Sequence, residues 1–248
     1  MRFVSCICAI LLMGATVAAA DQASTPRKVV INSEPFPPLS TVEGTGFEDL
    51  LAKEMYRRLG IEIDINMVPS ERGLVNANAG IDDGTLSRVG GMSSKYRNLL
   101  QIEEIAVERD YVAFARRSDI RIDGWSSLKP YDVGIVNGWK ILERNIKDVR
   151  SLTKVRQPMQ LFQLLELGRV DVIVFARYSG LQMIHDLGLK GVEVLEPPLA
   201  SRATYFYLHK NHQGLVPRAA AALREMKADG TYRRLYDRII GPLASGSE

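Results

Sequence analysis

The chain is poor in cysteine, and the two cysteines that it has lie near the amino terminus. Cys6 and Cys8 are the cysteines among the 248 residues. The chain beyond them can therefore form no internal disulfide, thiolate metal site or cysteine nucleophile. Neither cysteine follows the small-residue pattern of a lipobox, so we expect no lipid anchor.

A strong charge of either sign is also missing. The 32 lysines and arginines nearly balance the 29 acidic residues, which leaves a formal net charge of +3. Such a balance favours neither nucleic acid nor a membrane surface as a partner. Of the three histidines, His209 and His212 are close in sequence but have no cysteine or further histidine nearby, so we expect no metal. The chain contains no phosphate-cradling loop, nucleophile elbow or dinucleotide fingerprint, so we expect no cofactor.

The first twenty residues have the layout of an export signal. Arg2 precedes an uncharged, largely apolar run at residues 3–17, and Ala18, Ala19 and Ala20 supply small residues before Asp21. This layout predicts a signal peptide at residues 1–20 and a periplasmic mature protein. The alternative is a membrane anchor, but the run is shorter than the roughly 20 residues that span a bilayer.

Strand and helix patterns alternate along the remaining chain in two successive sets. In the first set, we expect strands at 28–32, 61–67 and 111–115, with helices at 46–60 and 70–79. In the second set, we expect strands at 131–136, 170–175 and 203–209, with helices at 139–145, 159–167 and 179–187. Two further amphipathic helices are expected at 215–227 and 231–240. Alternation of this kind predicts an α/β protein with mostly parallel sheets.

Short segments in a fixed order resemble a known family. They are Gly46-Phe47-Glu48, Met92-Ser93-Ser94-Lys95-Tyr96-Arg97, Gly168-Arg169-Val170-Asp171 and Lys227-Ala228-Asp229-Gly230-Thr231-Tyr232. In order and spacing they resemble the family 3 extracellular solute-binding proteins, whose best-studied members bind amino acids for ABC transporters.

The resemblance implies a type II periplasmic-binding fold, in which two α/β lobes are joined by two strands and close over a ligand. It places lobe 1 at residues 27–114 plus 210–243 and lobe 2 at residues 115–209. The hinges would lie near 113–118 and 207–210. It also implies a monomer that works with the membrane permease of an ABC transporter.

Candidate ligand residues in lobe 1 combine one aromatic ring with several cation and hydroxyl groups. Phe36 follows the first strand within a proline-rich turn and can pack on a ligand or belong to the core. Arg97 matches the arginine that clamps a ligand carboxylate in the family, and Ser93 and Ser94 add hydroxyl donors.

Two further arginines compete with Arg97 as anion binders. Arg72 and Arg88 both follow strand or turn patterns that bring them toward the expected cleft. Each can instead form an internal salt bridge, for which Glu71 or Asp83 would be the partner.

In lobe 2, Gly138 precedes a predicted helix that begins near Trp139, and the free backbone N–H groups at its start favour an anion. Trp139 can close over a ligand or belong to the core. Many amino-acid binders of the family carry an aspartate at the position of Ala176, where it pairs with the ligand ammonium. Here Ala176 is followed by Arg177, which favours an anionic or carboxylate-rich ligand, or a site formed by other residues.

We therefore predict that the protein binds a small, polar, carboxylate-bearing solute and delivers it to a permease without chemical turnover. One alternative is a periplasmic dehydratase on the same fold, with Glu34, Glu48 or Glu71 as general acid or base. Another alternative is a solute sensor that acts through a separate receptor.

Overall fold

The computed structural model describes residues 26–245, so the predicted signal peptide at residues 1–20 lies outside the described residues. The strands are β1 Lys28–Ser33, β2 Glu62–Met67, β3 Gly84–Val89, β4 Leu99–Gln101, β5 Val107–Ala115, β6 Asp132–Val136, β7 Ser151–Val155, β8 Val172–Ala176 and β9 Glu193–His209. The α-helices are α1 Phe47–Arg58, α2 Ser70–Ala79, α3 Lys140–Asn145, α4 Pro158–Glu166, α5 Arg177–Leu187, α6 Val216–Ala228, α7 Thr231–Ile239 and α8 Gly241–Ser245. Short 3₁₀ turns occupy Met92–Ser94, Trp125–Leu128 and Lys210–Leu215.

The strands form one continuous sheet with two parallel ends and an antiparallel middle. Their order is β2-β1-β3-β9-β5-β8-β6-β7, with β4 paired to β9. β1 pairs in parallel with β2 and β3, and β6 pairs in parallel with β7 and β8. The predicted α/β class, with parallel pairing in each half, is confirmed.

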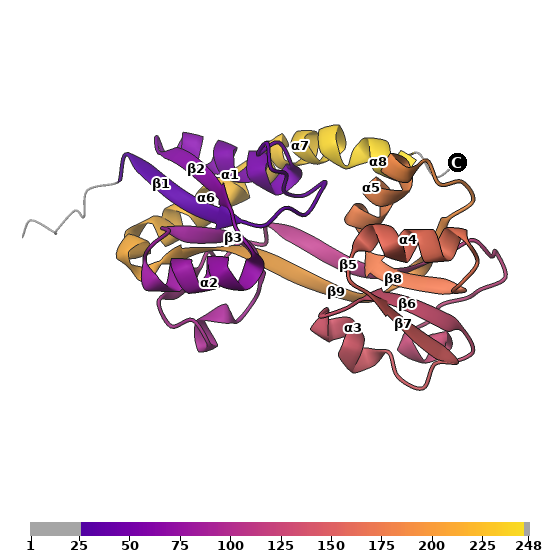
Figure 1. Cartoon of the computed structure of the whole chain (residues 1–248). Helices are drawn as coiled ribbons and strands as arrows, with labels where there is room; N and C mark the ends of the chain where they lie inside the picture. Colours follow the sequence, from indigo (N-terminus) through magenta and orange to yellow (C-terminus); the bar gives the residue numbers. More distant parts are fainter. Residues whose placement is uncertain (1–25, 246–248) are drawn as a thin grey trace, which may run out of the picture.

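The long strands β5 and β9 carry the sheet from one half of the molecule to the other (Figure 1). Residues 107–111 of β5 pair with the middle of β9, and the register then shifts so that Ala113 faces Leu195. At its far end β9 pairs with β3 and β4, while β5 pairs with β8. These two strands are therefore the direct sheet connection between the halves.

Each half has its own apolar core. The core of the first half is built around Phe47, Met55 and Leu223, and includes Leu208 of β9. In the second half the cores include residues 112–115 of β5 together with residues of β6 and β8. We accordingly propose that the chain changes lobes near 107–111 and 200–204, earlier on both strands than the predicted hinges at 113–118 and 207–210.

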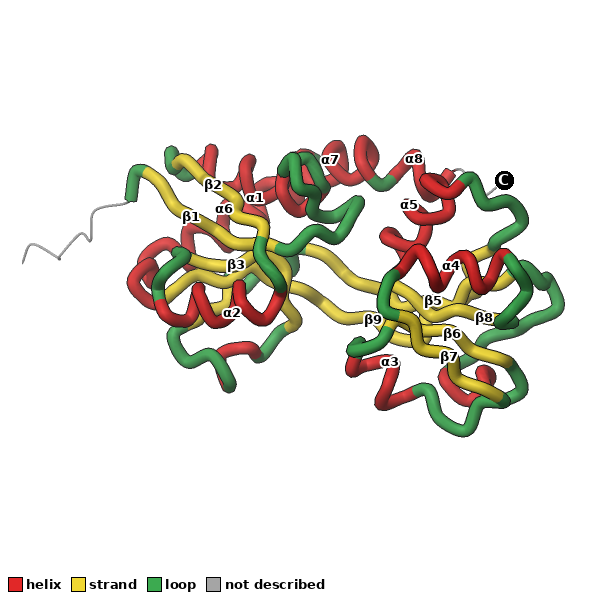
Figure 2. Tube along the Cα trace, viewed as in Figure 1, coloured by secondary structure: helices red, strands yellow, loops and turns green. Residues whose placement is uncertain are grey.

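Helices cover the two halves and also link them. Figure 2 shows α2 and α4 on one side of the sheet, and α7 and α8 running from the first half toward α5 in the second. α8 packs against α5, and Tyr178 of α5 packs against the core of the first half. Within the described residues, no helix is both long enough and apolar enough to cross a bilayer.

Candidate ligand-binding site

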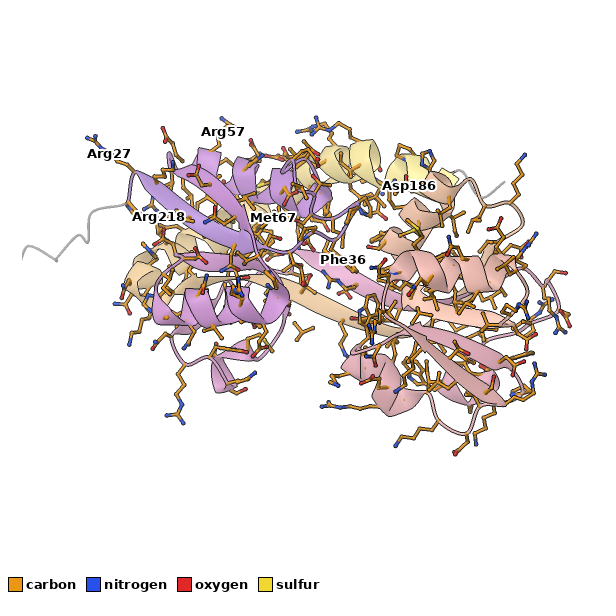
Figure 3. The ribbon with its side chains drawn as sticks, in the orientation of Figure 1. Arg27, Phe36, Arg57, Met67, Asp186 and Arg218 are labelled. Atoms are coloured by element: carbon orange, nitrogen blue, oxygen red, sulfur yellow. The ribbon has the colours of Figure 1, made fainter. Side chains whose placement is uncertain are left out.

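Aromatic rings from the two halves meet where the strands cross. Phe36 lies in the loop after β1 and points toward the second half (Figure 3), with its ring centroid 6.1 Å from that of Trp139. Trp139 stacks on Phe175 at 4.7 Å and meets the edge of Tyr111 at 5.9 Å. Gly138, with φ of 87°, supplies the turn that places Trp139 before α3. The structure therefore brings together the predicted residues Phe36, Gly138 and Trp139.

Arg88 is buried in the first half, at the end of β3. The residue is 7% exposed, and its Nη1 donates to Glu34 Oε1 at 3.2 Å and to Ser70 Oγ at 3.0 Å. Its Nε and Nη2 have no hydrogen-bond partner among the described residues. Burial lowers the pKa of Arg88, and Glu34 opposes that shift. A buried guanidinium with two free donors is expensive, and an anionic ligand would satisfy it.

The salt-bridge partners that the sequence suggested for Arg88 are engaged elsewhere. Glu71 accepts hydrogen bonds from Lys95 and Tyr96. Asp83 contacts His212 at 2.6 Å and accepts the backbone N–H of Val30. The expectation of Glu71 or Asp83 as the partner was wrong, because these carboxylates satisfy other donors and Glu34 takes their place.

A second arginine, Arg109, was missed by the sequence analysis. It lies on β5, with its guanidinium carbon 4.6 Å from the Phe36 ring centroid and Nη2 3.8 Å from Glu48 Oε1. Its buried Nε has no hydrogen-bond partner among the described residues. The strand expected at 111–115 begins at Val107 in the structure, and the charged run Glu108-Arg109-Asp110 lacks the apolar pattern that would indicate its start. Arg88 on β3 and Arg109 on β5 thus both carry buried donors without a partner among the described residues.

Arg177 is neutralised by carboxylates of both crossing strands. Its Nε donates to Asp110 Oδ2 at 3.0 Å, and its terminal nitrogens donate to Glu196 at 2.5 and 3.0 Å. It borders a narrow crevice together with Phe36, Arg109 and Ser179. Because its donors are occupied, Arg177 orders this end of the crevice without offering a free charge.

The other predicted residues of lobe 1 are exposed and separate from this cluster. Ser93 Oγ donates to the carbonyl of Leu99 at 2.6 Å, and Ser94 Oγ donates to that of Gly91 at 2.9 Å. Arg72 and Arg97 are exposed. In the described part of the chain, these four share no hydrogen bond, ion pair or ring contact with Phe36, Arg88, Arg109 or Trp139.

An open groove lies between the two halves beside the aromatic cluster. Its volume is about 400 Å³, and it is lined by Val89 of β3, Tyr111 of β5, Arg202 of β9 and Arg144 of α3. The groove thus joins the end of β3, both crossing strands and the helix that follows Trp139. Two arginines, Arg144 and Arg202, give its walls a cationic character.

The three carboxylates considered for acid–base chemistry have different surroundings. Glu34 is paired with Arg88 and Glu71 with Lys95. Glu48 is 2% exposed, and burial raises its pKa, while Arg109 and Ser87 act in the opposite direction. Among residues 26–245, no group of three His, Cys, Asp or Glu side chains is arranged to hold a metal ion.

A two-core α/β molecule with crossing strands and a polar groove between its halves has the architecture of a solute-binding protein. Residues 29–242 match the bacterial extracellular solute-binding proteins, family 3, and the chain belongs to this family. The predicted family is confirmed.

Relatives by sequence are distant. An uncharacterized protein of Shewanella oneidensis is 27% identical over 194 residues, covering 75% of this chain and 73% of the relative. The L-cystine-binding protein TcyA of Bacillus subtilis is 21% identical over 197 residues, covering 79% of this chain and 73% of the relative.

Solved structures share the fold at low identity. An ancestral cationic amino acid solute-binding protein has a TM-score of 0.71 at 18% identity, over 86% of this chain and 96% of that one. A histidine kinase sensor domain with similarity to periplasmic binding proteins reaches 0.69 at 16% identity, over 87% and 96% of the two chains. The GluR0 ligand-binding core of Nostoc punctiforme, in complex with L-glutamate, reaches 0.67 at 20%, over 85% and 98%. The predicted type II periplasmic-binding fold is confirmed.

Proposed function

We propose that this protein binds a small, amino-acid-like anion between its two lobes and closes over it by a hinge at β5 and β9. The observation that carries the proposal is the buried guanidinium of Arg88, whose Nε and Nη2 lack a partner among the described residues. Arg88 is next in sequence to Val89, which lines the interlobe groove. Arginine donates paired hydrogen bonds to one carboxylate, so Nε and Nη2 suit a carboxylate ligand.

The surroundings of Arg88 favour an anion with an apolar or flat part. Arg109 supplies another unused donor, and Arg144 and Arg202 line the groove. Phe36 and Trp139 offer ring faces from opposite halves. We therefore assign the carboxylate clamp to Arg88 in place of Arg97, whose exposed position gives a ligand no enclosure.

Movement of the lobes is the physical basis for capture. Each half keeps its own core, while the sheet that joins them narrows to β5 and β9, so the halves can rotate as rigid bodies. The names of several relatives and structural neighbours include amino acids, among them L-cystine, cationic amino acids and L-glutamate. Export to the periplasm and delivery to an ABC permease, without turnover, complete the proposal.

A thermal-shift screen of residues 21–248 tests binding. The panel contains amino acids, polyamines, dicarboxylates and aromatic acids. A ligand present at about 100 times its dissociation constant stabilises the folded protein by roughly 2.7 kcal/mol. If acids and amino acids give no shift while polyamines do, the proposed anion site is wrong.

Variants then locate the clamp. Arg88→Ala is expected to weaken binding of the screen hit at least tenfold, because truncating a buried charged contact costs about 2–5 kcal/mol. Arg72→Ala and Arg97→Ala remove exposed arginines of the same half and are expected to change the dissociation constant less than about threefold, or about 0.7 kcal/mol. A larger loss in Arg97→Ala than in Arg88→Ala would return the clamp to Arg97.

A further inference from the structure

The backbone next to Arg88 has an unusual conformation. Ser87 has a φ of 37°, in the left-handed region that favours glycine. The pairing of β3 with β9 shifts register between Thr85 and Arg88, which marks a β-bulge. Bulges re-aim side chains, and here Leu86, Ser87 and Arg88 are all buried in succession. The kink at Ser87 therefore sets the direction of the Arg88 side chain.

A chain of hydroxyl groups holds this kink in place. Ser87 Oγ contacts Glu48 Oε1 and lies 2.9 Å from Thr204 Oγ1. Thr204 Oγ1 in turn donates to the carbonyl oxygen of Val107 at 2.8 Å. This chain of hydrogen bonds joins α1, β3, β9 and the start of β5, where the two lobes meet.

The number of hydrogens available in this chain of hydrogen bonds indicates the protonation state of the Glu48 carboxyl group. Each hydroxyl has one hydrogen to donate. Thr204 gives its hydrogen to Val107, and Ser87 can give its own to Thr204. The contact between Ser87 and Glu48 then lacks a hydrogen unless Glu48 supplies it. All three contacts are satisfied together when the carboxyl group of Glu48 is protonated and donates to Ser87.

We propose that Glu48 is a positioning residue that holds a proton in the ligand-free protein, completes this chain and thereby fixes Arg88 for anion binding. The inference deepens the proposed function and rests on it. When Glu48 loses its proton, the chain of hydrogen bonds through Ser87 and Thr204 loses one of its members. The new negative charge also lies 3.8 Å from Arg109, where it competes with a ligand anion.

The charges around Glu48 are consistent with this role. Burial raises the pKa of Glu48 from 4.5, and the neighbouring carboxylate of Asp49 adds to the shift. Arg109 and Arg88 face the same group and act against it. Tyr232 of α7 also interacts with Glu48, and burial raises the pKa of Tyr232 to about 12, so it stays neutral where Glu48 titrates. With Glu48 protonated, anion affinity is highest below its raised pKa and falls as pH rises through it.

Carbon-13 NMR of the ligand-free protein tests the proton directly. The Glu48 carboxyl signal is assigned by its loss in Glu48→Gln. We expect it to titrate above the ordinary value of 4.5. Titration at or below that value would overturn the inference. This readout needs no ligand, so it fails independently of the proposed function.

Affinity for L-glutamate, measured by calorimetry across pH, tests the positioning role. In the wild type, affinity is expected to fall about fivefold as pH rises through the Glu48 titration. Glu48→Gln keeps a donor for Ser87 and should abolish that pH dependence. Glu48→Ala and Ser87→Ala break the chain, and each should weaken binding about tenfold, which is 1.4 kcal/mol.

Asp49→Asn is the matched control, because Asp49 is a buried carboxylate on the same helix that accepts hydrogen bonds from Ser40, Thr41 and Gly46. It should lower stability and keep the pH-dependent step, moved to lower pH because the Asp49 charge no longer raises the pKa of Glu48. If Asp49→Asn abolishes the step as Glu48→Gln does, or if Glu48→Gln retains it, the positioning role is wrong. If L-glutamate does not bind the wild type, the carboxyl titration alone decides.

Discussion

At the scale of single residues, the candidate arginines are of two kinds. Some have their hydrogen-bond donors paired with carboxylates, and others have buried donors without a partner among the described residues. Arg177 belongs to the first kind, because Asp110 and Glu196 occupy its guanidinium from two strands. Arg88 belongs to the second, because two of its nitrogens are buried without a partner. Both were candidate ligand residues in the sequence. Sequence pattern alone could not separate them, since the difference lies in which carboxylates the fold brings near.

Arg177→Ala is therefore expected to affect stability more than binding. Its removal leaves two carboxylates beside each other without their cation, and charge-assisted hydrogen bonds of this kind contribute about 1.5–3 kcal/mol. Urea unfolding should show a loss of about 2 kcal/mol in the free energy of unfolding. This value lies in the lower half of the range because Arg177 is partly exposed and solvent screens its charge. Arg117→Ala removes an exposed arginine paired with Asp119 and should lower stability much less than Arg177→Ala does. A tenfold loss of ligand affinity with unchanged stability would make Arg177 a ligand residue.

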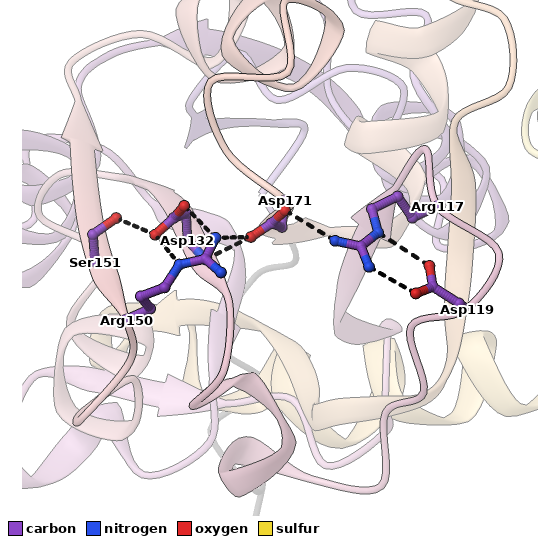
Figure 4. Close-up of polar contacts among 6 residues, drawn as sticks. All are labelled: Arg117, Asp119, Asp132, Arg150, Ser151 and Asp171. Atoms are coloured by element: carbon purple, nitrogen blue, oxygen red, sulfur yellow. Dashed lines mark hydrogen bonds and ion pairs between the residues drawn. The ribbon is translucent and has the colours of Figure 1, made fainter.

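The polar network at Arg117 illustrates how little an exposed set of ion pairs implies about function. Arg117, Asp171 and Arg150 form a line of ion pairs that ends on Asp119 and Asp132 (Figure 4). Every charged group in it has an opposite partner. It ties the start of β6 to the segment before β8, and it is exposed, so its contribution to stability is small.

At the scale of elements, the sequence predicted those whose apolar period is visible. The helix expected at 46–60 and the strand expected at 61–67 correspond closely to α1 and β2. β3 was not predicted, because Thr85, Ser87 and Arg88 are buried polar residues that interrupt an apolar pattern. The first half of β9 was also missed, since Pro197 and Pro198 are typical of a loop. Arg88 lies on β3 and Arg109 on the polar start of β5. Neither segment shows a strand pattern in the sequence, so the sequence could not show that the fold buries these two arginines.

Helix α1 should contribute an acid-sensitive part of the stability. Hydrogen bonds from Arg57 and then Arg58 lower the pKa of Glu54 from 4.5 to about 2. Because the folded pKa is depressed, the contribution is complete above the unfolded value near 4.5 and is lost as pH falls toward 2. Glu54→Gln should flatten the decline of the free energy of unfolding in that window. Glu62→Gln, at an exposed glutamate of β2, should leave the decline unchanged. Equal slopes in Glu54→Gln and the wild type would refute the prediction.

Helix α5 packs closely on the core through a glycine. A Cβ at Gly180 would lie 2.2 Å from Cζ of Phe114, which is fully buried. Gly180→Ala should therefore displace the ring and cost about 1–3 kcal/mol, the range for overpacking a core. Gly214→Ala has open space and should be nearly neutral in the same thermal unfolding assay. If Gly180→Ala left the stability unchanged, α5 would be able to shift on the core of the second half. It would then also be free to move during lobe closure.

At the scale of the whole molecule, two strands and one helical segment join the halves. Tyr178 of α5 and Tyr236 of α7 share a hydrogen bond of 2.9 Å between their hydroxyl groups. Tyr236 also packs edge-on against Phe47 in the first core. This pair ties lobe 2 to the C-terminal helices in addition to the hinge strands. Any rotation about β5 and β9 must either carry this contact along or break it.

Distances between spin labels can measure that rotation. The chain beyond Cys8 contains no cysteine, so a cysteine pair can be introduced into residues 21–248 without removing any native one. Val75 on α2 and Met159 on α4 are exposed and lie in different halves. In Val75→Cys/Met159→Cys, the screen hit should shorten and narrow the distance distribution, because closure brings the lobes together. Val42→Cys/Val75→Cys, with both labels in the first half, should not change.

Tyr178→Phe in the same labelled protein tests the helical link. Losing the hydroxyl pair removes about 0.5–1.5 kcal/mol of stabilisation from the contact between α5 and α7. The ligand-free distribution for Val75→Cys/Met159→Cys should therefore broaden, while the distribution within the first half stays as it was. Tyr236→Phe should have the same effect, and the double variant should add little, because both changes break one bond. If the ligand-free distributions of Tyr178→Phe, Tyr236→Phe and the double variant all match that of the parent labelled protein, β5 and β9 alone set the arrangement of the lobes and the C-terminal helices follow passively.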